Sequence, residues 1–153
     1  EIYQCDWSSD VCSSDLAEPI GRWMARAGAE LLAESDLIAP VPLHRRRLFT
    51  RQFNQSAALA QVIARESGVP LDSFALVRVK ATRPQVGLSC AQRGANLSGA
   101  FKVTPERAAA VRGRRIVLVD DVLTTGATAN ATARALLRAG ATQVDPLVFS
   151  HGR

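Results

Sequence analysis

The sequence predicts an α/β domain in which a central, mainly parallel sheet is flanked by helices. Short apolar runs typical of strands alternate with helical repeats along the chain. One run, Ile116-Val117-Leu118-Val119, is continuously apolar and mostly β-branched, as in a strand that is covered on both faces. At 153 residues the chain is long enough for one domain with its own core.

Each predicted element of the first half follows from a local pattern. Apolar residues recur at helical spacing over 17–35, with Pro19 suited to a first helical turn. Residues 37–43 form a short apolar run that is typical of a strand, with weakened pairing at its two prolines. Asn54 is a capping residue for a helix that ends near Ser67, before a glycine.

The second half continues the alternation. Strands are predicted over 74–79 and 101–103, and residues 80–98 between them lack a sustained period and predict a long loop. A brief helix begins at Thr104-Pro105-Glu106 and ends at Gly113. The remaining elements are a strand over 115–120, a helix over 127–139 and a last strand over 144–149, near a sheet edge because it contains Pro146.

Composition restricts the classes of function. The chain is 47% hydrophobic and 22% charged, and no apolar run approaches the ~20 residues of a membrane span. No secretory signal is visible, and three cysteines at 5, 12 and 90 fit no zinc pattern, so we expect a reducing, cytoplasmic location. Aromatic residues make up 5%, which argues against a base-stacking platform.

The first sixteen residues differ in kind from the rest. They repeat Ser-Ser-Asp twice, contain four acidic residues and no Lys or Arg, and show no regular period. The segment resembles a translated sequencing-adapter or fusion sequence, and the alternative is a native, partly disordered arm. We therefore divide the chain into a non-native or disordered segment, 1–16, and a domain, 17–153. Residues 17–153 contain all 19 basic residues of the chain and 10 of its 14 acidic ones. Their net charge of +9 suits anionic partners or a solubilising surface.

The most informative stretch is 116–128, IVLVDDVLTTGAT. A buried strand ends in Asp120 and Asp121, and the small, hydroxyl-rich loop Thr124-Thr125-Gly126-Ala127-Thr128 then opens a helix. Ligands of parallel sheets bind beyond the carboxyl ends of the strands, and a loop of this kind at a helix N-terminus is a phosphate cradle. The carboxylates would repel phosphate, but they can accept hydrogen bonds from sugar hydroxyls or hold the water shell of Mg²⁺. The combination predicts a ribose 5-phosphate site, against the alternatives of a capping device and a simple turn.

These residues resemble the signature with which type I phosphoribosyltransferases bind 5-phosphoribosyl pyrophosphate. The resemblance extends to the ComF/GntX family through Pro40-Val41-Pro42-Leu43-His44-Arg45-Arg46-Arg47, with Arg51 and Phe53-Asn54-Gln55. A third matching group lies in the long loop: Gln85, Leu88, Arg93, Asn96 and Gly99-Ala100-Phe101. The match covers the chain from about residue 17 onward and implies a type I phosphoribosyltransferase-like fold with a long flexible loop over the site.

The resemblance also implies roles for residues. Asp120 and Asp121 would orient the ribose, with Mg²⁺ held through the ligand and water rather than by direct protein ligands. Leu43, His44 and Arg45 would contact pyrophosphate, although a solvated loop is the plain alternative for the histidine and arginines. The loop 80–97 would close over the reacting ribose, and Arg93, with Arg83 or Lys80, would neutralise the leaving pyrophosphate. Family members commonly carry an N-terminal cysteine-rich zinc module, which this sequence does not show.

Three functions remain open at this point. The first is an enzyme that transfers phosphoribosyl from 5-phosphoribosyl pyrophosphate to a nitrogenous base, with Mg²⁺. The second is a non-catalytic module of natural competence and DNA uptake, with single-stranded DNA and a helicase-like protein as the partners that the ComF resemblance implies. The third is a gene fragment with no activity. The sequence does not identify an acceptor base.

Overall fold

The computed structural model describes residues 10–42, 54–80, 89–123 and 126–151. Its centre is a parallel sheet of three strands in the order β1-β4-β5. The strands are β1 (Leu37–Pro40), β4 (Arg115–Leu123) and β5 (Gln143–His151). The predicted α/β class and parallel sheet are therefore confirmed, and β5 lies at the edge of this sheet, as Pro146 predicted.

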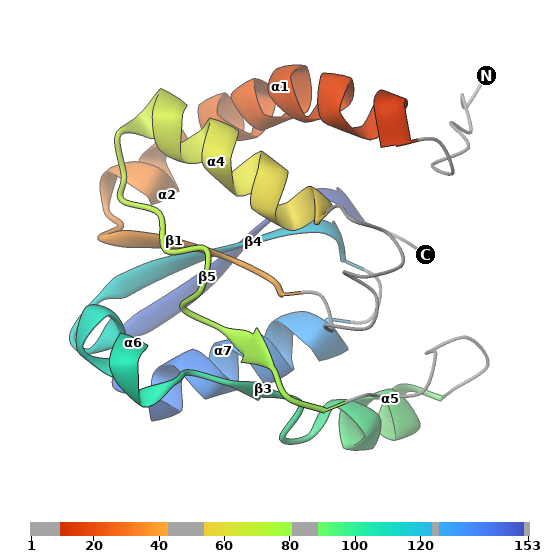
Figure 1. The fold of residues 1–153 in the computed structure, drawn as a ribbon, viewed down its shortest axis with the longest axis vertical. Helices are drawn as coiled ribbons and strands as arrows, with labels where there is room; N and C mark the ends of the chain where they lie inside the picture. The colour runs from red at the N-terminus through yellow and green to blue at the C-terminus, as the bar shows by residue number, and fades with distance from the viewer. Residues whose placement is uncertain (1–9, 43–53, 81–88, 124–125, 152–153) are drawn as a thin grey trace.

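Helices cover both faces of the sheet (Figure 1). On one face lie α1 (Asp10–Ala27), α2 (Ala29–Ala33) and α4 (Gln55–Ser67), and on the other lies α7 (Ala127–Arg138). The alternation of side chains along β4 divides the core accordingly. Val117 and Val119 pack in a cluster with α1 and α4, whereas Ile116 and Leu118 pack in a cluster with Leu136 of α7. The apolar run is thus buried on both faces, as predicted.

A smaller unit extends from the α7 face. It contains β2 (Val77–Arg78) paired antiparallel with β3 (Phe101–Lys102), together with α5 (Cys90–Leu97) and α6 (Pro105–Val111). Leu97, Ala100 and Phe101 of this unit are buried in the same cluster as Leu136, so the unit packs onto α7. The strand predicted over 74–79 is shorter than expected, because Phe74 and Ala75 lie in a turn in which their N–H groups donate to Asp72. Before this turn, Leu71 bridges to Ile38 of β1.

The helix predicted over 17–35 differs from the structure in its start and in a break at Gly28. α1 begins seven residues earlier, at Asp10, and ends before Gly28, after which α2 is a separate short helix. Pro19 consequently lies inside α1 rather than in its first turn. Ala17, Met24 and Ala25, which lie within the predicted segment, are buried in one cluster with residues of α4.

Several boundaries agree with local sequence signals. The Asn54 side chain accepts a hydrogen bond from the Ala57 N–H at the start of α4, and Gly68 ends that helix with a left-handed φ of 74°. α6 begins at Pro105 after Thr104, and the chain turns at Gly113, as predicted. None of the helices in the described part of the chain is long and apolar enough to cross a membrane.

Candidate ribose-phosphate site

The two predicted acids lie near the carboxyl end of the central strand. β4 runs three residues further than the predicted end at Asp120, because Val122 and Leu123 still pair with Ser150 and His151 of β5. Asp120 is buried, with 9% of its surface exposed, and Asp121 is half-buried. One carboxylate is thus held inside the domain while its neighbour is partly open to solvent.

Asp120 is fixed by contacts from two directions. Its Oδ1 accepts a hydrogen bond from the Ser56 hydroxyl of α4 at 3.1 Å and another from the Asp121 N–H at 3.0 Å. The pKa of Asp120 is raised to about 7, mainly by burial and then by hydrogen bonding and charge repulsion from the Asp121 carboxylate, while the Ser56 hydrogen bond acts in the opposite direction. Asp120 therefore exchanges its proton near neutral pH.

The loop after the acids ends in a left-handed glycine. Gly126 has a φ of 75°, and its carbonyl accepts the first helical hydrogen bond of α7 from the Asn130 N–H at 2.8 Å. A residue with a side chain rarely adopts this conformation, so the sequence needs glycine here. Ala127 and Thr128 form the first turn of α7, as predicted, whereas Thr124 and Thr125 lie outside the described residues.

The end of β1 lies beside the acids. The Val41 N–H donates to the Val119 carbonyl of β4 at 3.0 Å, and the Asn54 amide donates to the Val41 carbonyl at 3.3 Å. The predicted pyrophosphate contacts Leu43, His44 and Arg45 lie outside the described residues. Asn54, which bonds to Val41, and Ser56, which bonds to Asp120, lie at the same end of the sheet as the acid pair.

The predicted loop over 80–98 is wrong in its last part, because α5 occupies Cys90–Leu97. The Ser89 hydroxyl accepts from the Gln92 N–H, and the Gln92 side chain accepts from the Ser89 N–H, which is a complete capping box. Its Ser-x-x-Gln pattern is visible in the sequence and could have located the helix. Arg93 lies on α5, but its side chain is outside the described residues, as is all of Arg83; Lys80 is exposed.

Sequence reasoning missed the role of Ser56. A serine in the first turn of a predicted helix is unremarkable in sequence, but here it is 5% exposed and bonds to a residue 64 positions away. The available signal was its place on the apolar side of the helix, two residues after the cap, where a buried hydroxyl needs a partner. Asn54 was predicted as a cap, and its second bond, to Val41, was not foreseen.

Among the residues that the structure describes, no group of three or more His, Cys, Asp or Glu side chains is arranged to hold a metal ion. The adjacent carboxylates of Asp120 and Asp121 are nevertheless of the right chemistry for Mg²⁺, which prefers oxygen ligands and keeps several of its waters. The pair fits an ion that arrives with a phosphorylated ligand.

Comparison with protein families assigns the fold and site to a class. The model of the phosphoribosyl transferase domain matches residues 54–150, from the cap of α4 to β5. The chain belongs to the phosphoribosyl transferase domain family, in its ComF-type branch. The resemblance predicted from the acids, the phosphate loop and the basic stretch is thereby confirmed.

Two curated relatives represent this branch. The chain is 44% identical over 109 residues to "DNA utilization protein YhgH" of Escherichia coli K12, covering 71% of this chain and 46% of the relative. It is 37% identical over 109 residues to "Competence protein F" of Haemophilus influenzae, covering 71% of this chain and 47% of the relative. The aligned part thus spans about half the length of these relatives.

Solved structures agree on the fold. The phosphoribosylpyrophosphate amidotransferase of B. subtilis superposes with a TM-score of 0.60 at 23% identity, over 87% of this chain and 26% of that one. A purine phosphoribosyltransferase from Pyrococcus horikoshii gives a TM-score of 0.50 at 16% identity, over 85% and 68%. At these identities the likeness establishes the type I phosphoribosyltransferase fold, as predicted, and nothing about substrates.

Proposed function

We propose that this chain binds 5-phosphoribosyl pyrophosphate together with Mg²⁺ and transfers the phosphoribosyl group to a nitrogenous base. The observation that carries the proposal is the acid pair Asp120–Asp121 at the end of β4, followed at once by the loop that enters α7 through Gly126. A single ligand that carries both ribose hydroxyls and a phosphate would contact the carboxylates and the helix N-terminus together.

The chain's own residues would act mainly by positioning. Asp120 and Asp121 accept hydrogen bonds from the two ribose hydroxyls, and the 124–128 loop holds the 5-phosphate at the start of α7. Leu43, His44 and Arg45 lie on the segment that joins β1 to α4 and would contact the pyrophosphate. Mg²⁺, when bound with the ligand, would neutralise charge on the pyrophosphate oxygens.

In the transfer step the bond from ribose C1 to the pyrophosphate oxygen breaks, and the oxygen keeps the electron pair. A nitrogen of the base supplies the pair for the new bond to C1. Arg93 on α5, with Lys80 or Arg83, would stabilise the charge that develops on the leaving group. Closure of residues 80–89, which precede α5, over the site would keep water from the cationic ribose.

A second candidate function is favoured by the relatives, which are described as DNA utilization and competence proteins. In this reading the chain is a cytoplasmic, non-catalytic module of DNA uptake, with single-stranded DNA or a helicase-like protein as partner. The net charge of +9 outside the first sixteen residues suits phosphodiester contacts. DNA affinity that falls steeply with salt, together with no turnover of any base, would favour this candidate.

Calorimetric titration with 5-phosphoribosyl pyrophosphate and Mg²⁺ tests the main proposal. Saturable binding that is lost in the Asp120→Asn, Asp121→Asn double variant supports it, and a screen of nitrogenous bases for pyrophosphate release then identifies the acceptor. The control is Asp145→Asn on β5, which removes one carboxylate where the double variant removes two, and which lies outside the acid pair. Absence of binding by the folded wild-type chain would exclude the proposed ligand.

A further inference from the structure

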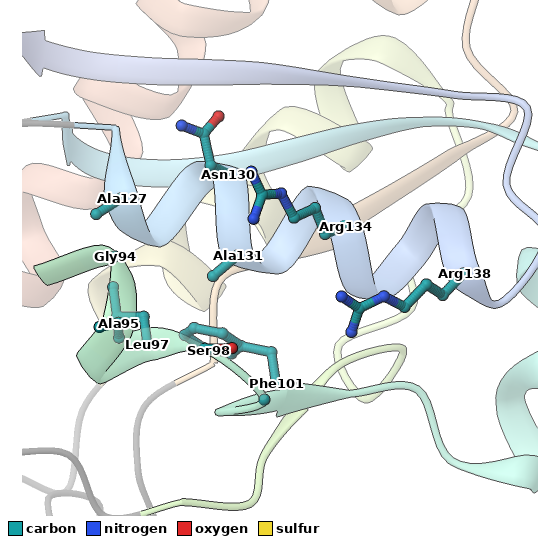
Figure 2. Close-up of a pocket in the computed structure, with 11 residues that line it drawn as sticks. Gly94, Ala95, Leu97, Ser98, Phe101, Ala127, Asn130, Ala131, Arg134 and Arg138 are labelled. Carbon is teal, nitrogen blue, oxygen red and sulfur yellow. The ribbon is translucent and has the colours of Figure 1, made fainter. Parts of the chain in front are cut away.

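A pocket lies on the α7 face of the sheet, between α7, α5 and β3 (Figure 2). Its volume is about 390 Å³, within the range of pockets that hold small molecules. It reaches Ala127 in the first turn of α7, but neither Asp120 nor Asp121 lines it. It is therefore distinct from the acid pair, although it reaches the first turn of the helix that follows the proposed phosphate loop.

One part of this pocket is apolar, and small residues form the side toward α5. Leu97 and Phe101, which lie side by side in Figure 2, are 1% and 6% exposed and close its base. The rim on the α5 side is formed by Gly94, Ala95 and Gly99, and a methyl group added at either glycine would meet no atom within 4 Å. Small residues thus leave the cavity open to a ligand from solvent.

The remaining wall is cationic. Arg134 and Arg138 come from successive turns of α7, and Asn130 lies one turn before them (Figure 2). None of the described residues that line the pocket is acidic. Within the described part of the chain, no carboxylate lies within ion-pair distance of either arginine, whereas Arg107 and Arg115 are both paired with acids.

A solvated helix face would also show unpaired arginines, but it would not need a cavity beside them. The guanidinium groups of Arg134 and Arg138 provide several N–H donors on one side of the pocket. Leu97 and Phe101 provide an apolar surface on the other. Guanidinium groups bind phosphate oxygens bidentately, and a sugar or base can cover the apolar floor. The size of the pocket matches a single nucleotide unit better than a lone phosphate ion.

We propose that the pocket between α5, β3 and α7 is a nucleotide-binding site in which Arg134 and Arg138 hold the phosphate and the Leu97–Phe101 floor contacts the sugar or base. The ligand is either a free nucleoside monophosphate or one nucleotide unit of a single strand, since both present the same chemistry. The site does not depend on the proposed transferase activity.

The test is an NMR titration of the full chain with adenosine 5′-monophosphate, with inorganic phosphate and with a short oligothymidylate. The amide signals of Ser98, Gly99 and Ala131 should move saturably with a nucleotide probe. The Arg134→Gln, Arg138→Gln double variant should weaken this binding about tenfold or more, because charge-assisted hydrogen bonds to the phosphate are lost. Glutamine keeps the helix propensity of arginine, so α7 should remain folded.

Two further variants separate the pocket from general charge. Ala95→Phe should block binding sterically without changing charge, since Ala95 is exposed on the pocket rim. Arg26→Gln removes an exposed arginine from α1, on the other face of the sheet, and should leave the affinity unchanged. Binding that survives Asp120→Asn, Asp121→Asn distinguishes this site from the ribose-phosphate site.

The probes also distinguish the two sources of the ligand. Saturation by adenosine 5′-monophosphate supports a free nucleotide, whereas saturation by oligothymidylate alone supports a strand. The proposal is overturned if neither nucleotide probe moves the pocket amides, if inorganic phosphate alone reproduces every shift, or if the arginine double variant binds as tightly as the wild type.

Discussion

The Ser56 hydroxyl donates a hydrogen bond of 3.1 Å to Oδ1 of Asp120, and both residues are buried. This contact joins the first turn of α4 to the end of β4, and so connects the segment after β1 with the acid pair. A helix that otherwise packs through apolar residues thereby helps to set the charge and direction of a site carboxylate. Ser56 is a positioning residue in the proposed site.

Replacing Ser56 with alanine should raise the pKa of Asp120 further, because the Ser56 hydrogen bond favours the ionised carboxylate. The free energy of unfolding should fall by about 1 kcal/mol, the usual worth of such a bond. A ¹³C titration of the Asp120 carboxyl group measures the pKa change. Ser67→Ala is the matched control, since the Ser67 hydroxyl donates to the Ile63 carbonyl and accepts from the Val69 N–H, at the end of α4 opposite to Ser56. Equal titration curves for wild type and Ser56→Ala would show that the contact does not tune Asp120.

The raised pKa of Asp120 predicts a particular pH dependence of stability. The folded state holds this proton up to about pH 7, whereas the unfolded chain loses it near 3.8. The free energy of unfolding therefore falls as pH rises between these two values. Asp120→Asn removes that contribution. Denaturant unfolding should show the variant gaining stability relative to wild type as pH rises to 7, on the order of 1 kcal/mol or more. A difference that is independent of pH would contradict the burial of an ionisable Asp120.

Gly126 provides a test of the phosphate loop. Gly126→Ala should cost about 1 kcal/mol of stability, because its φ of 75° is unfavourable for alanine, and it should also weaken ligand binding. Gly68→Ala is a closely matched control, since Gly68 has a φ of 74° at the far end of α4. Calorimetry should find the ligand affinity reduced only in the first variant. Equal ligand affinities in the two variants would show that the loop does not take part in ligand binding.

The two hydrogen bonds of the Asn54 side chain, to the Ala57 N–H and to the Val41 carbonyl, can be tested separately. Asn54→Asp keeps an oxygen to accept from the Ala57 N–H but loses the N–H that donates to the Val41 carbonyl, whereas Asn54→Ala loses both. The alanine variant should therefore lose about 1 kcal/mol of cap stability that the aspartate variant keeps. Both should weaken pyrophosphate affinity if the segment after β1 contacts that group. Thermal unfolding and calorimetry together measure the two effects.

The sequence predicted the parts of the fold that local chemistry determines. The apolar run of β4, the Asn54 cap, the glycine ends of α4 and α6 and the edge position of β5 each follow from residues within a few positions. The acid pair and Gly126 were predicted for the same reason, because a strand, two carboxylates and a small-residue loop occur consecutively.

The errors concern features that depend on distant residues. The bridge from Ile38 of β1 to Leu71 joins residues that are 33 positions apart. The bond from Ser56 to Asp120 spans 64 positions and leaves no local pattern. α5 is different, since the Ser-x-x-Gln pattern of its capping box is present in the sequence. The helix was not predicted because it has only eight residues and no sustained helical period around it.

A crystal structure of the chain with 5-phosphoribosyl pyrophosphate and Mg²⁺ tests the central claim most directly. The account predicts both ribose hydroxyls within hydrogen-bond distance of Asp120 and Asp121, about 2.6–3.2 Å, and the 5-phosphate at the 124–128 loop. A ligand whose ribose lies away from both acids, or whose 5-phosphate binds at the arginines of α7 instead, would contradict it.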